Sequence, residues 1–124
     1  MRELDAFKIL PRYIGGRYHH LLFKNRTAAT ETALDICAEF ELDDGSYLLL
    51  LRNGAPYSDE LALAYLAPDF TLRAHLPLPA GTLSEVRPVA SRRLSFRFGD
   101  AHRTVDVGSC SARRPFGRRW LQVH

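Results

Sequence analysis

Cysteine, lysine and long apolar runs are scarce in this sequence, and each scarcity excludes a class of protein. Only two of the 124 residues are cysteine, and no CxxC pair or Cys/His cluster has the spacing of a zinc site. The longest uncharged apolar stretch, Leu61 to Ala67, is too short to span a bilayer. No nucleotide or cofactor motif is present either. We therefore expect no cofactor, no metal and no membrane.

The amino-terminal residues and the cysteines predict the compartment. Acidic residues occur within the first five positions and no apolar run follows, so no signal peptide is predicted and the cytoplasm is expected. Both thiols are then expected to be free, with Cys37 inside a sheet and Cys110 in an exposed polar loop. Only two of the seventeen basic residues are lysine, and this arginine excess predicts a G+C-rich, bacterial genome.

Period-two alternation is the dominant pattern and predicts strands. Hydrophobic residues make up 46% and charged residues 25%, as in one globular domain spanning 1–124. From Leu34 to Leu42, alternate residues are apolar and are expected to share one face. Asp44-Gly45 predicts a two-residue turn that places Phe40 opposite Leu49, and Tyr47–Leu51 reads as a strand covered on both faces.

Two further hairpins follow along the chain. A two-residue turn at Pro68-Asp69 would pair Leu63 with Ala74 and Tyr65 with Leu72, and would place Phe70 on the same face as these four. Arg93–Phe98 and Arg103–Val107 form the third hairpin, whose apolar residues share a face only if the loop has an even number of residues. The outer face would then bring Arg93, Arg97 and Asp106 together.

These signals predict an all-β fold, a single antiparallel barrel or sandwich of about seven to ten short strands joined largely by hairpins. Gly15-Gly16 is expected to form a turn between the first two strands. Residues 77–81 are expected to form a loop or to cross a sheet edge, and a helical turn is allowed around Thr27–Thr32. Residues 112–124 are expected to form a basic loop or tail with a final strand in which Leu121 and Val123 point inward.

Candidate pocket groups are two acids and two histidines. The expected register places Glu39 and Glu41 opposite Leu50 and Leu48, and a carboxylate held against leucines is a candidate general acid. His75 and His102 are the candidate bases. The alternative is that the acids protect a sheet edge.

The arginine-rich carboxyl-terminal stretch is the candidate binding segment. Arginines beside aromatic rings combine phosphate contacts with base stacking. The same stretch also reads as an exposed loop that leads into the last strand. Its candidate residues are Arg113, Arg114, Phe116, Arg118, Arg119 and Trp120.

The leading functional hypothesis is a non-enzymatic module that binds a protein or a small ligand. One alternative is a nucleic-acid-binding protein that uses the arginine-rich segment, together with Arg92 and Arg93. Another is a small hydrolase or isomerase with a pocket at a barrel mouth. An open sheet edge also allows a homodimer.

Overall fold

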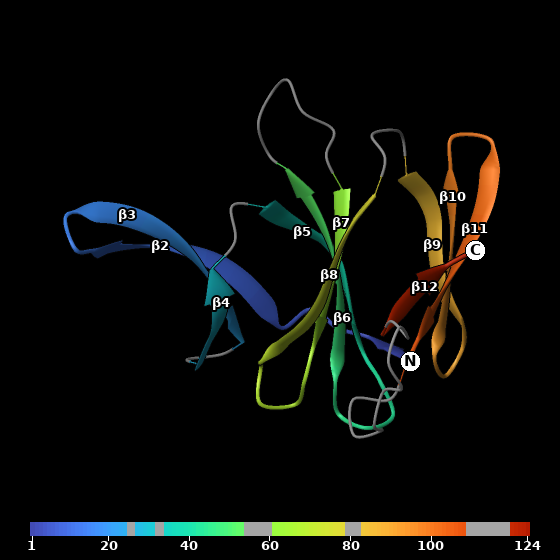
Figure 1. The fold of residues 1–124 in the computed structure, drawn as a ribbon, viewed down its shortest axis with the longest axis horizontal. Coiled ribbons are helices and arrows are strands. Elements are labelled where there is room, and N and C mark those ends of the chain that lie inside the picture. Colours follow the sequence, from blue (N-terminus) through green and yellow to red (C-terminus); the bar gives the residue numbers. More distant parts are fainter. Residues whose placement is uncertain (25–26, 32–33, 54–60, 79–82, 109–119) are drawn as a thin grey trace.

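The computed structural model describes residues 1–24, 27–31, 34–53, 61–78, 83–108 and 120–124, and these ranges contain strands and turns but no helix. Twelve strands pair antiparallel in three open sheets, so the all-β prediction is confirmed with more strands than expected (Figure 1). The strands are β1 (Arg2–Glu3), β2 (Phe7–Ile14), β3 (Arg17–Lys24), β4 (Thr27–Glu31), β5 (Leu34–Glu41), β6 (Tyr47–Asn53), β7 (Leu61–Leu66), β8 (Leu72–Leu78), β9 (Leu83–Ala90), β10 (Arg93–Phe98), β11 (Ala101–Val107) and β12 (Leu121–Val123).

Two of the sheets form a sandwich around the larger core. The five-stranded sheet has the order β1-β5-β6-β7-β8, and the four-stranded sheet has the order β12-β11-β10-β9. Apolar side chains from both sheets meet between them, among them Leu48, Tyr65, Leu94 and Val105, none of them measurably exposed. Burying a large apolar side chain is worth about 1.5–3 kcal/mol, so this layer supplies much of the stability.

The third sheet, β2-β3-β4, packs on the other face of the five-stranded sheet. Phe7 and Leu22, from the first part of β2 and the last part of β3, join Tyr47 and Leu49 in a second core. The Phe7 and Tyr47 rings meet edge to face with centroids 5.2 Å apart. Because β6 contributes to both cores, its continuous apolar run is buried on both faces, as expected.

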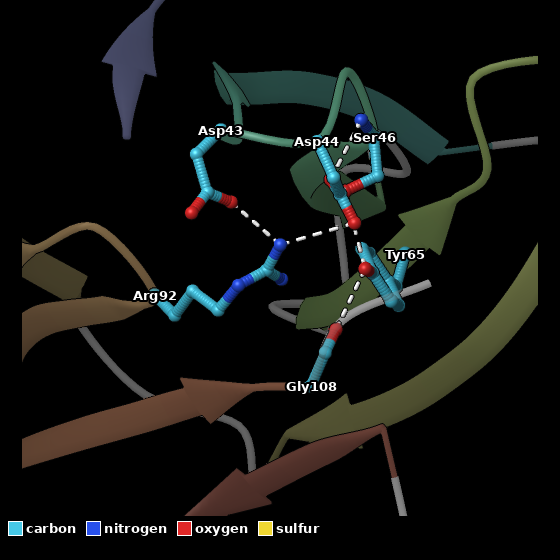
Figure 2. A network of polar contacts seen from close by, with 6 residues as sticks. All are labelled: Asp43, Asp44, Ser46, Tyr65, Arg92 and Gly108. Atoms are coloured by element: carbon cyan, nitrogen blue, oxygen red, sulfur yellow. Dashed lines mark hydrogen bonds and ion pairs between the residues drawn. The ribbon is translucent and has the colours of Figure 1, made fainter. Parts of the chain in front are cut away.

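A polar cluster ties the two sheets of the sandwich together at one end (Figure 2). Tyr65 donates its hydroxyl hydrogen to the carbonyl oxygen of Gly108 at 2.7 Å. The Ser46 hydroxyl lies 3.1 Å from the same phenol oxygen and also contacts the carboxylate of Asp44. Arg92, between β9 and β10, forms ion pairs with Asp43 at 2.5 Å and Asp44 at 3.0 Å. The ion pairs of Arg92 therefore connect the β5–β6 turn to the four-stranded sheet.

The β5–β6 turn corrects the expected register by one residue. The loop holds three residues, Asp43-Asp44-Gly45, and Gly45 takes the left-handed conformation at φ 81°. Phe40 therefore lies opposite Leu48 rather than Leu49, and Glu39 and Glu41 lie opposite Leu49 and Tyr47. A three-residue loop with glycine in the left-handed position uses the same Asp-Gly signal as a two-residue turn.

A bulge in β5 overturns the expected single apolar face. The register shifts between Ile36 and Ala38, so Cys37 has no residue of its own opposite on β6. One inserted residue reverses which face of the sheet each side chain beyond it occupies. Ile36 therefore packs against the second core, whereas Ala38 and Phe40 pack against the first.

The β7–β8 hairpin also has a three-residue loop, Pro68-Asp69-Phe70, instead of the two-residue turn. Two-residue hairpin turns need a positive φ that proline cannot adopt, whereas Phe70 here has φ 70°. A bulge follows the loop and leaves Arg73 without a residue of its own opposite on β7, so Tyr65 lies opposite Ala74. Phe70 packs against the second core. The expectation that Phe70 and Leu72 share the buried face was wrong, since Leu72 is 43% exposed.

Other local expectations divide between confirmed and wrong. The β10–β11 loop is two residues long, an even number, and Leu94 lies opposite Val105 on the same face, as expected. Arg93 pairs with Asp106, but Arg97 pairs with Glu85 on β9.

Gly15 and Gly16 form the expected turn, both with positive φ. Residues 27–31 are a strand rather than a helical turn, and β8 continues through residues 77 and 78, where an edge strand tolerates proline.

Candidate functional site

The four candidate pocket groups do not form one site. Glu39 and Glu41 lie on β5, and His75 lies on β8, which β6 and β7 separate from β5. His102 lies on β11 of the other sheet. Each group instead takes part in a local contact or lies on the surface. The described residues therefore do not assemble these acids and bases around a common cavity.

Glu39 anchors the chain between β1 and β2. Its side chain is 5% exposed, and its Oε1 accepts hydrogen bonds from the backbone amides of Ala6 and Phe7, the latter at 3.0 Å. The Glu39 carbonyl also accepts from the amide of Leu4 at 2.8 Å. A carboxylate that satisfies buried backbone donors fixes the direction in which β2 leaves the sandwich. This contact explains the buried acid without a general-acid role.

The other three groups have simpler surroundings. Glu41 forms an ion pair at 3.1 Å with Arg2, the residue opposite it on β1, so it does not lie on an open sheet edge as the alternative interpretation expected. The ring Nε2 of His102 lies 2.7 Å from the hydroxyl of the buried Ser95 across the β10–β11 ladder. His75 is exposed on β8, opposite Ala64.

Most of the arginine-rich candidate segment lies outside the described residues, namely Arg113, Arg114, Phe116, Arg118 and Arg119. Trp120 is described and packs partly buried against the larger core. The final strand β12 is present and pairs with β11, and Leu121 is buried at 3% exposure. Val123, expected to point inward, is 37% exposed because it lies near the end of an edge strand. The upstream pair Arg92 and Arg93 is held in ion pairs with aspartates.

The strand pair β2–β3 forms an arm that projects from the sandwich, on the side away from the four-stranded sheet (Figure 1). Only its base is covered by the second core. Toward the Gly15-Gly16 turn, Leu10 is 37%, Tyr13 66% and Ile14 54% exposed. Apolar side chains grouped on a projecting element are typical of binding surfaces.

The arm is also uniformly basic. Residues 7–24 hold Lys8, Arg12, Arg17 and Lys24 and not one carboxylate. Among the described residues, none of these four forms an ion pair. Arg12 instead lies over the Phe23 ring, with 4.9 Å from its guanidinium carbon to the centroid. Sequence reasoning missed this surface, although the absence of acids from residues 7–24 was a visible signal.

An acidic groove lies at the base of the arm, between β2 and β5. Two adjoining pockets of about 320 and 460 Å³ share Phe7 and Ile36 as lining residues. The exposed carboxylates around them belong to Glu3, Asp5 and Asp35, and they outnumber the one lining cation, Lys8. Within the described chain, β1 pairs only with Phe40 and Glu41, which leaves residues 35–38 of β5 without a strand neighbour on that edge.

Cys37 lines this groove and is exposed, contrary to the expectation that it is enclosed in the sheet. The bulge at this position turns its side chain outward. Partial desolvation nevertheless raises the pKa of its thiol, Arg52 opposes that rise, and Asp35 adds to it. A thiol with a raised pKa is a poor nucleophile at neutral pH. Cys110, the cysteine expected to be exposed, lies outside the described residues.

The described parts of the chain contain no group of three or more His, Cys, Asp or Glu side chains arranged to hold a metal ion. They also contain no helix long and apolar enough to cross a membrane. Comparison with models of known families, with curated proteins and with solved structures finds no match for this chain. The arm and its basal groove are therefore the candidate site, on geometry alone.

Proposed function

We propose that this protein is a non-enzymatic binding module that contacts a partner protein through the β2–β3 arm. The observation that supports this is the exposure of Tyr13 and Ile14 at the end of a projecting hairpin. Tyrosine and arginine are enriched in the central parts of protein interfaces, and aspartate and glutamate are depleted there. The arm has this composition, with two tyrosines, two arginines and no carboxylate.

Site-specific photo-crosslinking in cells tests this proposal. Tyr13 is replaced by a photoreactive phenylalanine analogue, which preserves the size of the ring. The matched control carries the same analogue at Val89, which is 49% exposed on β9 of the sandwich. We expect a discrete protein adduct from position 13 and none from position 89. Adding Ile14→Ser should weaken the adduct, because it removes an exposed apolar contact beside the reporter. Equal adducts from both positions would contradict the proposal.

Nucleic-acid binding is the second candidate, because the arm carries four basic residues and no carboxylate. A two-stranded antiparallel ribbon fits the major groove of DNA, and phosphate contacts make binding strongly dependent on salt. Filter binding with duplex DNA and with RNA at 50 and 200 mM salt tests it. Binding that falls steeply with salt and is lost in Arg12→Gln/Arg17→Gln would favour this candidate over a partner protein.

A further inference from the structure

The arm and its basal groove have complementary chemistry on one molecule. The outer half of the arm carries Arg12 and Arg17 beside exposed apolar side chains. The groove at the base carries three exposed carboxylates, Glu3, Asp5 and Asp35, against one cation, Lys8, and its apolar lining includes Leu4 and Ile36. Leu10 reaches the rim of the groove, but Arg12, Tyr13, Ile14 and Arg17 do not line it. The groove is therefore open to a basic, apolar hairpin from elsewhere.

The order of charges along the arm determines how two copies would fit. An eight-residue strand spans about 25 Å at roughly 3.3 Å per residue. The three exposed carboxylates lie at the base, where they outnumber Lys8 and Lys24, and the two arginines lie toward the other end. Two arms placed side by side in opposite directions would therefore bring each basic tip to the other copy's acidic base. A two-fold axis produces this arrangement and makes every contact twice.

The backbone at the groove is also suited to a neighbouring strand. Residues 35–38 of β5 lack a strand partner on the edge that faces the groove, among the residues described. β2 is itself an edge strand of its sheet. Unpaired edges accept an added strand through main-chain hydrogen bonds. Pro11 in β2 has no amide hydrogen, which restricts such pairing to the rest of the strand.

We propose that the groove binds the arm of a second copy of this chain, in a two-fold dimer in which the arms are exchanged reciprocally. This inference rests on the proposed function, because it names the partner protein of the same surface. A self-association also agrees with the groove better than nucleic acid does. At the base of the arm, the exposed carboxylates of Glu3, Asp5 and Asp35 outnumber Lys8 and Lys24 and would repel phosphates that approached there.

Sedimentation velocity of the full chain, from 1 µM to 1 mM, measures the association directly. Two charge-reversal variants test the contact: Arg12→Glu/Arg17→Glu in the arm, and Asp5→Lys/Asp35→Lys in the groove. The matched control is Arg87→Glu/Arg103→Glu, which makes the same charge change at exposed positions of the four-stranded sheet. Circular dichroism melts establish that each variant folds.

We expect a dimer whose dissociation constant rises at least tenfold in either contact variant and less than threefold in the control. Mixing the two contact variants should restore a heterodimer, because each acidic arm then meets a basic groove and each basic arm an acidic groove. Alkylation of Cys37 in the groove should slow as the wild-type concentration rises through the dissociation constant, and this slowing should be absent in the arm variant.

Three results would overturn the inference. The first is a wild-type chain that stays monomeric up to 1 mM, and the second is a dimer indifferent to both charge reversals. The third is a mixture of contact variants that remains monomeric although each variant is folded. A monomer whose position 13 still crosslinks to a different protein would overturn the exchange of arms while leaving the proposed function standing. Arginine-dependent binding of nucleic acid by a monomer would overturn both.

Discussion

Replacing Glu39 with alanine should detach the arm from the sandwich. The Glu39 carboxylate is almost fully buried and accepts hydrogen bonds from the amides of Ala6 and Phe7. Alanine leaves both donors without that partner, and a buried donor left unsatisfied costs about 1–3 kcal/mol. Because the Ala6 amide is only partly buried and can bond to water instead, we expect the free energy of unfolding to fall by about 2–4 kcal/mol rather than by the full cost of two buried donors. A domain of this size has about 5–15 kcal/mol in total, so the loss is a large fraction.

Thermal and denaturant melts measure this loss, and two variants control for it. At about 4 °C for each kcal/mol, Glu39→Ala should lower Tm by about 8–16 °C. Glu39→Gln retains an acceptor oxygen and should lower Tm less. Glu41→Ala removes a neighbouring acid whose partner Arg2 is 71% exposed, and an exposed ion pair is worth only about 0–1 kcal/mol.

Hydrogen exchange separates anchoring of the arm from a general loss of stability. In Glu39→Ala, the amides of Ala6 and Phe7 should exchange faster than those of Leu49 and Leu63 in the central strands, because only the former lose their acceptor. If Glu39→Ala unfolds at the same free energy as Glu41→Ala, the carboxylate does not anchor β2. Unchanged protection of the two amides would refute the same reasoning.

Two further predictions concern the polar cluster and the thiol. Tyr65→Phe should destabilise the protein by about 1–2 kcal/mol in denaturant melts, because the Gly108 carbonyl loses its hydrogen bond while the ring stays packed; an unchanged melt would mean that this bond does not couple the two sheets. Alkylation of Cys37 in dilute protein should be slow at pH 7 and accelerate above about pH 9, since burial raises its pKa. Removing the attractive charge in Arg52→Gln should raise that pKa further and slow the reaction, Asp35→Asn should do the reverse, and opposite shifts would contradict the assigned causes.

The fold class was predictable because it depends on local signals. Alternation of apolar residues and turn-forming pairs such as Gly15-Gly16 act over a few residues, and they located most of the strands. The shared apolar face of the β10–β11 hairpin was predicted correctly, because whether the loop has an odd or an even number of residues alone decides which face Val105 occupies. In the β5–β6 and β7–β8 hairpins, the errors lay in the length of the loop and in a bulge within one of the strands. One extra loop residue costs little locally, yet it changes which side chains lie opposite each other.

The division into three sheets was not predictable from alternation. Phe7 and Leu22 have the same pattern as strands of the sandwich, but they pack on the outer face of the central sheet. Which face a strand covers depends on contacts between residues far apart in sequence, and the alternation within one sequence does not reveal them. The Glu39 anchor is of this kind, because its partners lie 32 and 33 residues away. The sequence places Glu39 in a strand, but it gives no sign of the backbone amides that its carboxylate binds.

The candidate site follows from this same long-range packing. The base of the arm is buried because Phe7 and Leu22 reach the second core, whereas the strands continue past that core toward the turn. A hairpin longer than the surface that supports it must expose its outer apolar residues, unless a partner covers them. At the base of the arm, the bulge at Cys37 turns Ile36 toward the second core. Among the described residues, the short strand β1 pairs only with Phe40 and Glu41, which leaves the edge of β5 beside Asp35 unpaired. The mismatch in length between arm and sandwich thus accounts for the exposed tip, while the shortness of β1 leaves room for the groove that would receive it.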